Sequence, residues 1–321
     1  MINEVSITTG ARLHFGPLSV AAPAGGRFGG VGVMIDAPRL VLKARRQTQD
    51  AVLGETHLIS RVTEFLRRSR EHLAPQDRVA CQIQILETVP SHCGFGSGTQ
   101  LGLAVASLIS RLSGESQVPL PVLARRVQRG MRSAVGLYGF QQGGFLVDGG
   151  RLDANQLGTL VARVPFPDEW KFVLAKPVSA AGLSGEAEQS AFARQPPMPS
   201  SLTAELCRIV LMDWLPAVIE RDFSRCSESM FAFGHAVGDF FTPTQGGVFA
   251  HPRMAEWADV IRRQGIEGVA QTSWGPTLAA LCDSKTHADQ LCRDFRQDPR
   301  WSDCTFDVVS PLNHGAQLQV A

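Results

Sequence analysis

The residues whose spacing most strongly suggests chemistry form a glycine-rich loop at positions 94–100. The loop reads Gly94, Phe95, Gly96, Ser97, Gly98, Thr99 and Gln100. Glycine lets a backbone approach a ligand closely and adopt positive φ angles. The apolar run at positions 101–109 predicts a buried helix directly after the loop. The free N–H groups and the dipole at the start of such a helix favour a phosphate or pyrophosphate group.

The loop does not match three better-known glycine-rich motifs. The Walker A motif needs a lysine that the loop does not have, and the glycine spacing differs from the dinucleotide fingerprint. A nucleophile elbow is also excluded, because Ser97 stands directly between two glycines. A plain turn at the start of a helix is the structural alternative to anion binding.

The hydrophobic periodicity predicts the elements that must position this loop. A half-buried strand at 78–87 precedes it, and an amphipathic helix at 56–73 lies before that strand. The change in sequence pattern at the Pro-Phe-Pro segment 165–167 predicts two domains, residues 1–165 and 166–321. The second domain is expected to contain helices at 202–220, 223–241, 254–264 and 286–296, strands at 170–175, 305–309 and 316–320, and a strand, glycine turn and helix at 268–281.

Several charged and aromatic residues are candidates for binding. Arg132 adjoins a glycine-rich segment and is a candidate ligand for phosphate or carboxylate. Trp274 is a candidate for stacking on an aromatic ligand or for core packing. By contrast, we expect the arginines at 125, 126 and 129 on a solvated helix face, and the histidines at 92, 235 and 314 in structural roles.

Composition excludes several classes of function. The chain of 321 residues carries 31 Lys and Arg against 30 Asp and Glu, so a net charge of +1 gives no field that favours nucleic acid. It has no apolar run long enough to span a membrane and no leader pattern, so a cytoplasmic location is expected. Seven cysteines without a C-x-x-C pair are expected to be buried free thiols.

Two glycine-bearing segments together resemble the GHMP kinase superfamily. Residues 90–99 resemble its P-x-x-x-G-L-G-S-S-A phosphate loop, and residues 271–277 resemble its C-terminal glycine motif. More narrowly, the chain resembles the β-ribofuranosylaminobenzene 5′-phosphate synthases from about residue 7 to residue 320. The segments that carry this narrower resemblance are 11–16, 96–101, 138–140, 143–145 and 273–277.

The resemblance implies an α/β (α+β) fold of the GHMP type with two domains. The N-terminal domain would be ribosomal-S5-domain-2-like, the C-terminal domain ferredoxin-like, and the active site would lie between them. The implied reaction joins 4-aminobenzoate to phosphoribosyl pyrophosphate, releasing CO₂ and pyrophosphate in tetrahydromethanopterin biosynthesis. Mg²⁺ is the expected cofactor, the partners are small-molecule substrates, and a homodimer is left open.

For this reaction we assign catalytic roles to Arg12 and His14, which would hold a carboxylate or the 5′-phosphate. The residues expected to bind phosphate or substrate are Gly94, Phe95, Gly96, Ser97, Gly98, Thr99, Gln100, Arg132, Gly143, Gly144, Ser273, Trp274, Gly275 and Thr277. The sequence does not identify metal ligands, because Mg²⁺ needs few carboxylates and leaves almost no linear pattern.

Two alternative functions use the same loop. One is an ATP-dependent small-molecule kinase, and the other is a phosphate-ligand-binding protein without catalysis. The kinase is disfavoured because Gly98 and Thr99 stand where the kinases usually carry Ser and Ala. Residues 132–136 also lack the aspartate that many of these kinases use as a base.

Overall fold

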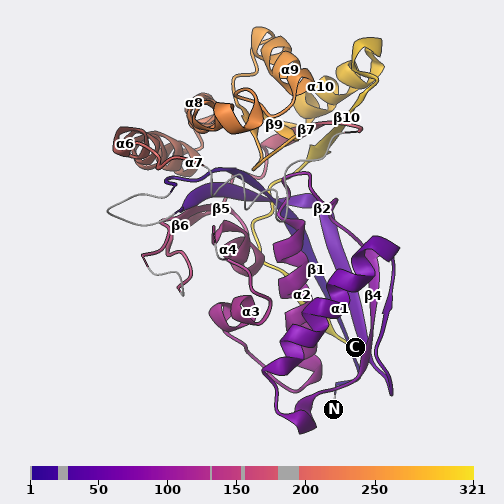
Figure 1. Cartoon of the computed structure of the whole chain (residues 1–321). Coiled ribbons are helices and arrows are strands. Elements are labelled where there is room, and N and C mark those ends of the chain that lie inside the picture. The colour runs from indigo at the N-terminus through magenta and orange to yellow at the C-terminus, as the bar shows by residue number, and fades with distance from the viewer. Residues whose placement is uncertain (1, 21–27, 131, 153–155, 180–194) are drawn as a thin grey trace.

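The computed structural model describes residues 2–20, 28–130, 132–152, 156–179 and 195–321. Two sheets organise these residues, one in the N-terminal half and one in the C-terminal half (Figure 1). The first sheet has seven strands and the second has four. No helix among these residues is long and apolar enough to cross a membrane.

The first sheet is built around two long paired strands. The strand order is β11-β1-β2-β4-β3, and β5 pairs with both β2 and β6. Three helices of this half contact the sheet, and a fourth packs on those three helices (Figure 1). The strands are β1 (Glu4–Gly16), β2 (Gly30–Arg46), β3 (Ala51–Leu53), β4 (Cys81–Glu87), β5 (Phe145–Asp148), β6 (Leu160–Val164) and β11 (Gln317–Val320), and the helices are α1 (Thr56–Glu71), α2 (Ser97–Leu112), α3 (Leu120–Arg126) and α4 (Val135–Gln142).

The second sheet has the order β10-β7-β9-β8 and is antiparallel throughout. Helix α8 packs against β8 and also reaches β1 of the first sheet. The strands are β7 (Lys171–Pro177), β8 (Val269–Gln271), β9 (Leu278–Cys282) and β10 (Cys304–Val309). The helices are α6 (Ser200–Arg208), the π-helix Ile209–Trp214, α7 (Leu215–Glu220), α8 (Phe223–Gln245), α9 (Pro252–Arg263) and α10 (Lys285–Gln297).

The predicted helix and strand positions agree with most of these elements, with two errors. Residues 278–282 form strand β9 and not the expected helix, because all five are apolar and buried between β7 and β8. A short apolar run does not by itself distinguish a buried strand from a buried helix. The expected helix at 202–220 is also divided, since a π-helix lies immediately before the turn that contains Pro216.

The last strand belongs to the other sheet from the one expected. Residues 316–320 were expected to close the second domain, whereas β11 pairs with β1 in the first sheet, with Val5 opposite Val320. Its alternating sequence specifies a strand but not its partner, and the edge of β1 supplies the free backbone groups. The division at residues 165 and 166 stays a prediction. Each of the seven cysteines is free, as expected, but Cys207 is exposed and Cys304 is only half-buried.

Trp214 joins the two halves of the main hydrophobic core. Its ring centroid lies 5.2 Å from that of Phe15 on β1 and 5.1 Å from that of Phe145 on β5. On the other side it lies 5.6 Å from Phe233 on α8. Because Trp214 is 1% exposed, its packing fixes the C-terminal helices against the first sheet.

We expect Trp214→Ala to lower the free energy of unfolding by about 3–5 kcal/mol, since it leaves a large cavity in this core. Leu211→Ala in the same π-helix is the control, because Leu211 is 63% exposed and its loss should cost under about 0.5 kcal/mol. Urea unfolding of both variants measures the difference. Equal stability of the two variants would contradict the role given to Trp214.

Candidate functional site

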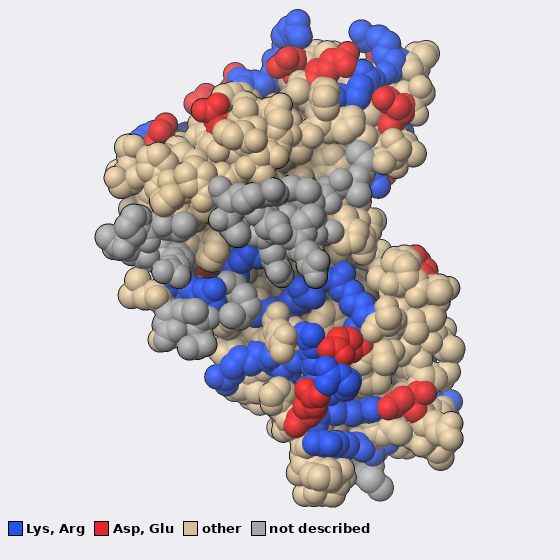
Figure 2. All heavy atoms as spheres, viewed as in Figure 1, with Lys and Arg blue, Asp and Glu red and all other residues tan. Residues whose placement is uncertain are grey.

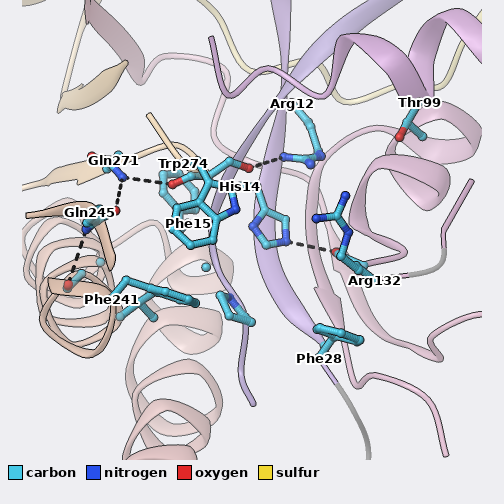
Figure 3. Close-up of a pocket in the computed structure, with 18 of the residues that line it drawn as sticks. Arg12, His14, Phe15, Phe28, Thr99, Arg132, Phe241, Gln245, Gln271 and Trp274 are labelled. Atoms are coloured by element: carbon cyan, nitrogen blue, oxygen red, sulfur yellow. Dashed lines mark hydrogen bonds between the residues drawn. The ribbon is translucent and has the colours of Figure 1, made fainter. Parts of the chain in front are cut away.

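A cavity of about 270 Å³ opens between the two sheets. Its wall comes from the end of β1, the first turn of α2, residues 128–130 and 132–133, the C-terminal half of α8, and the residues after β8. Segments more than 250 residues apart in the sequence therefore meet at one site (Figure 3). This is the position between the two predicted domains where the site was expected.

Thr272 ties three of the predicted motifs together. Its hydroxyl donates to the Gly94 carbonyl oxygen at 2.9 Å and accepts from the His14 backbone N–H at 3.0 Å. The Ser273 N–H donates to the His14 carbonyl at 2.7 Å, and the Arg12 N–H donates to the Phe95 carbonyl at 3.1 Å. β1, the glycine-rich loop and the C-terminal glycine motif thus share one hydrogen-bond network.

The glycines of the loop are required by this close packing. Gly94 has a φ angle of +82°, and a Cβ there would lie 2.3 Å from the Thr272 carbonyl oxygen. Gly96 has a φ angle of +69° and stands immediately before α2. Only glycine adopts such angles without strain. The loop conformation that starts α2 is therefore determined by its glycines.

Arg12 lies between the starts of two helices. A Cβ on Gly96 would be 2.9 Å from Arg12 Nε, and a Cβ on Gly136, in the first turn of α4, would be 3.1 Å from the same atom. Its Nη1 donates to the Ser273 hydroxyl at 3.2 Å. The positive dipole ends of α2 and α4 therefore lie beside a guanidinium group, and this arrangement favours an anion.

The two ends of the cavity differ in character. Thr99, Arg129 and Arg132 join Arg12 at one end, which we call the anion end. Lys and Arg side chains gather over the N-terminal half on the face seen in Figure 2. At the opposite, aromatic end the cavity is lined by Phe15, Phe241 and Trp274, and the last two rings meet edge to face with centroids 4.9 Å apart (Figure 3).

Two glutamine amides close the wall behind the aromatic end. Gln271 Nε2 donates to Gln245 Oε1 at 3.2 Å and to the Ser273 carbonyl at 3.1 Å. Gln245 Nε2 donates to the carbonyl of Val248 at 2.9 Å. These bonds attach the connection after α8 to the C-terminal glycine motif and fix both amides (Figure 3).

His14 lies between the two ends of the cavity (Figure 3). Burial lowers its pKa well below the ordinary value of 6.5, and the charge of Arg12 lowers it further. The imidazole is therefore neutral at pH 7. Its Nε2 atom lies 3.0 Å from the Ser133 hydroxyl, which also hydrogen-bonds the carboxylate of Asp148.

Asp148 is a buried carboxylate behind the cavity wall. It accepts hydrogen bonds from the Ala134 N–H at 2.6 Å and the Gly150 N–H at 2.9 Å. Burial raises its pKa, while these donors and Ser133 lower it in part. Among the described residues that line the cavity, none is an aspartate or a glutamate.

The described residues do not by themselves form a magnesium site. They contain no group of three His, Cys, Asp or Glu side chains that could hold a metal ion. Magnesium commonly binds through one or two carboxylates and the phosphates of a substrate. With no carboxylate on the described wall, a magnesium ion would depend on oxygens of the ligand.

The structure brings six of the predicted site residues into the cavity wall and places the others around it. The six are Arg12, His14, Thr99, Arg132, Ser273 and Trp274. Phe95 contributes only its backbone carbonyl to the network, and Ser97 lines a separate small hollow beside Leu40. Gly98 lies against the guanidinium of Arg61, since a Cβ there would be 2.1 Å from Arg61 Nη2.

The remaining predicted residues support the frame. Gln100 is fully buried, accepts from the Thr9 hydroxyl at 2.8 Å and donates to the Gly136 carbonyl. Gly143 and Gly144 lie outside the cavity wall, packed against the chain near His314 and Val164. Gly275 has a φ angle of +61°, and Thr277 is buried with its carbonyl bonded to Thr272. Direct ligand binding by these five residues stays a prediction.

Sequence reasoning missed several residues of the site. Arg129 was assigned to a solvated helix face, but it follows the end of α3 and lines the cavity. Arg126, assigned to the same face, is buried and pairs with Glu115 at 2.6 Å, so that expectation was wrong for both. Thr272 and Asp148 were missed because only three-dimensional contacts give them a role. The one sequence feature that could have identified Arg129 as a site residue is its position three residues before Arg132, a predicted ligand of phosphate or carboxylate.

Comparisons with known proteins agree with the motif resemblance. Residues 214–299 match the family described as GHMP kinases C terminal. A beta-ribofuranosylphenol 5'-phosphate synthase of Methanothermobacter thermautotrophicus is 28% identical over 312 residues, covering 89% of this chain and 91% of the relative. A protein of the same name from Archaeoglobus fulgidus is 28% identical over 329 residues, covering 98% of this chain and 99% of the relative.

Solved structures share the fold. The crystal structure of homoserine kinase from Cytophaga hutchinsonii superposes with a TM-score of 0.71 and 15% identity, covering 99% of this chain and 98% of that one. The expected GHMP-type mixed fold is therefore confirmed, and so is the resemblance to the GHMP superfamily and its ribofuranosyl-arene phosphate synthases. Because both of these relatives are named synthases, the prediction of an enzyme is confirmed as well.

We expect Thr272→Val to lower the free energy of unfolding by about 2 kcal/mol, because it leaves the buried His14 N–H without its acceptor. Thr272→Ser keeps the hydroxyl and should lose less than about half as much. Urea unfolding of the two variants gives the comparison. If valine and serine were equally tolerated, the hydroxyl would not be the link between the motifs.

The pKa of His14 predicts a pH dependence of stability. Below its ordinary value of 6.5 the histidine takes up a proton in the unfolded chain but not in the folded one. The free energy of unfolding should therefore fall as the pH drops from 7 to 5, and His14→Gln should reduce this slope. Protonation of Asp148, whose pKa is raised by burial, stabilises the folded chain as the pH falls. The test therefore compares the slope of unfolding free energy against pH in wild type with the slope in His14→Gln. Equal slopes in denaturant titrations would contradict the low pKa.

Proposed function

We propose that this protein transfers a 5-phosphoribosyl group from phosphoribosyl pyrophosphate to the ring of a para-substituted benzoate. The products are a β-ribofuranosyl-arene 5′-phosphate, CO₂ and pyrophosphate. The observation that carries the proposal is the polarity of the cavity, in which an arginine-rich end and an aromatic end flank a neutral histidine. This polarity suits a donor with two phosphate-bearing groups and an aromatic acceptor.

The anion end suits the pyrophosphate. Its charge rises as it leaves ribose C1, so groups that bind it more strongly in the transition state accelerate the reaction. Arg12, Arg129 and Arg132 offer guanidinium donors there, and Thr99 adds the first turn of α2. The positive dipole ends of α2 and α4 are fixed before the substrate arrives, so they need little rearrangement.

The aromatic end suits the acceptor ring. The rings of Phe241 and Trp274 meet at 67°, and Phe15 lies beside them on the same side of His14 (Figure 3). Such a wall packs against the face and edge of a benzoate ring. The carboxylate-bearing carbon of the ring would then point toward the centre of the cavity, where the ribose carbon lies.

The reaction needs no strong protein nucleophile. The bond between ribose C1 and the pyrophosphate oxygen breaks, and its electron pair leaves with the pyrophosphate. The ring carbon that bears the carboxylate forms the new bond to ribose C1, helped by electron donation from the para substituent. Loss of CO₂ from that carbon then returns an electron pair to the ring and restores its aromaticity.

The para substituent is an amine or a hydroxyl. The motif resemblance implies 4-aminobenzoate, whereas the names of the relatives describe a ribofuranosylphenol product. Both substituents donate electrons to the reacting carbon, so the same cavity chemistry serves either. We therefore propose 4-aminobenzoate and 4-hydroxybenzoate as the two acceptors to compare, in the synthesis of a methanopterin-type cofactor.

Magnesium is part of this proposal as an ion that arrives on the pyrophosphate and, when bound, balances its charge. The Thr99 hydroxyl, which lines the anion end, would be one neutral oxygen ligand for the ion. The kinase alternative has less support, because the described cavity wall offers no carboxylate to act as a base toward an acceptor hydroxyl.

The test is pyrophosphate release from phosphoribosyl pyrophosphate with each acceptor. We expect Arg12→Ala to lower kcat/KM roughly 100-fold, the usual cost of one charge-stabilising donor in the transition state. Arg125→Ala is the control, since Arg125 is exposed on α3 and does not line the cavity. It should stay within about twofold of wild type.

Three outcomes would contradict the proposal. Arg12→Ala at the wild-type rate would remove Arg12 from the site. ADP formation from ATP and a small alcohol, without pyrophosphate release from phosphoribosyl pyrophosphate, would favour the kinase. Thermal stabilisation by phosphoribosyl pyrophosphate without turnover of either acceptor would favour a binding protein.

A further inference from the structure

The proposed reaction creates a positive charge that the described part of the cavity wall does not balance. As pyrophosphate leaves, positive charge builds on ribose C1 and its ring oxygen. The described wall holds Arg12, Arg129 and Arg132 but no carboxylate. Arginines stabilise the leaving group and oppose the cationic sugar. A negative group near the sugar would lower the barrier, and this inference rests on the proposed function.

Asp148 is a carboxylate that does not line the cavity but is connected to it by hydrogen bonds through Ser133 and His14. It is 1% exposed, and Ser133 links it to His14. The two backbone N–H donors and the Ser133 hydroxyl occupy its oxygens, as is typical of an ionised carboxylate. His14 and Ser133 line the cavity, whereas Asp148 stands behind them.

The direction of these hydrogen bonds determines what His14 presents to a ligand. An ionised Asp148 only accepts, so the Ser133 hydroxyl donates to it. Ser133 Oγ then accepts from His14 Nε2–H, and the remaining nitrogen, Nδ1, carries a lone pair. The side of the imidazole away from Ser133 faces Phe15 and Trp274 (Figure 3). The histidine is thus held as a neutral acceptor at the centre of the cavity.

We propose that His14 accepts a hydrogen bond from a hydroxyl of the ribose in phosphoribosyl pyrophosphate, and that Ser133 and Asp148 are positioning residues that deliver negative charge to it. The bond strengthens as the sugar becomes cationic, because the hydroxyl becomes a better donor. Similar bonds to a sugar hydroxyl supply several kcal/mol in glycoside hydrolysis. No proton is transferred, so the balance of the reaction is unchanged.

A structural role for Asp148 is the competing explanation. Its bonds to Ala134 and Gly150 hold the start of α4 and the turn after β5, and their loss would disturb the fold. Loss of folded protein lowers the rate equally with every donor. Loss of a bond to one ribose hydroxyl instead changes the rate ratio between donors with and without that hydroxyl.

The experiment compares phosphoribosyl pyrophosphate with its 2-deoxy and 3-deoxy analogues as donors. The enzymes are wild type, Asp148→Asn, Ser133→Ala and Ser133→Thr. Tyr138→Phe is the matched control, because it removes a hydrogen bond of 2.9 Å to Gly158, which lies against Asp148, without touching the chain to His14. The intrinsic reactivity of each donor cancels when its rate ratio is compared across variants.

We expect Asp148→Asn and Ser133→Ala to lower kcat with the ribose donor roughly 30-fold, with KM within about threefold, as for an interaction made in the transition state. For one of the two analogues, the deoxy-to-ribose rate ratio should rise about tenfold in these two variants. Ser133→Thr, which keeps the hydroxyl, and Tyr138→Phe should keep the wild-type ratio.

Unchanged ratios for both analogues in every variant would overturn the inference and leave Asp148 a structural residue. If Asp148→Asn does not fold, the pair Ser133→Ala and Ser133→Thr decides by the same ratio. A shift in ratio with Tyr138→Phe would also overturn the inference. Wild-type protein that releases no pyrophosphate from the ribose donor would instead refute the proposed function, and this inference with it.

Discussion

The geometry of the site depends on the hydroxyl of Thr272. It is fully buried, donates to Gly94 and accepts from the backbone of His14, so one side chain joins two sheets and a loop. Each group would be costly to leave unpaired away from water. Because Gly94 has no side chain, its backbone contacts Thr272 directly, and the start of α2 is held against β1. The anion end of the cavity is therefore assembled by a contact between the two halves.

This junction also explains why the cavity has a polarity. Strand β1 passes through the centre of the cavity and carries Arg12, His14 and Phe15 in that order. Alternate residues of a strand point to opposite faces, but a register shift between His14 and Gly16 breaks the alternation at this point. All three side chains consequently line one cavity, with the arginine at the anion end and the phenylalanine at the aromatic end. The order of charge along the site follows the order of the strand.

The sequence was sufficient for features that depend on local chemistry. Alternating glycines before an apolar run predicted the start of α2, and periodicity located α1 and α8 to within a few residues. It was insufficient where a partner decides the outcome. Residues 278–282 form a strand because β7 and β8 flank them, and β11 joins β1 although it is the last element of the chain. Asp148 reads as a turn residue until Ser133 and His14 are seen beside it.

Gly98 departs from the pattern of the GHMP kinases, and its neighbours give a physical reason for the glycine. The GHMP kinases usually carry serine at this position, and here a Cβ would lie 2.1 Å from Arg61 Nη2. A serine would require the Arg61 guanidinium to move off the first turn of α2. Burial lowers the pKa of Arg61, which reflects the cost of holding a cation at this position. The glycine therefore makes room for a positive charge beside the start of α2, where a serine would place a neutral hydroxyl.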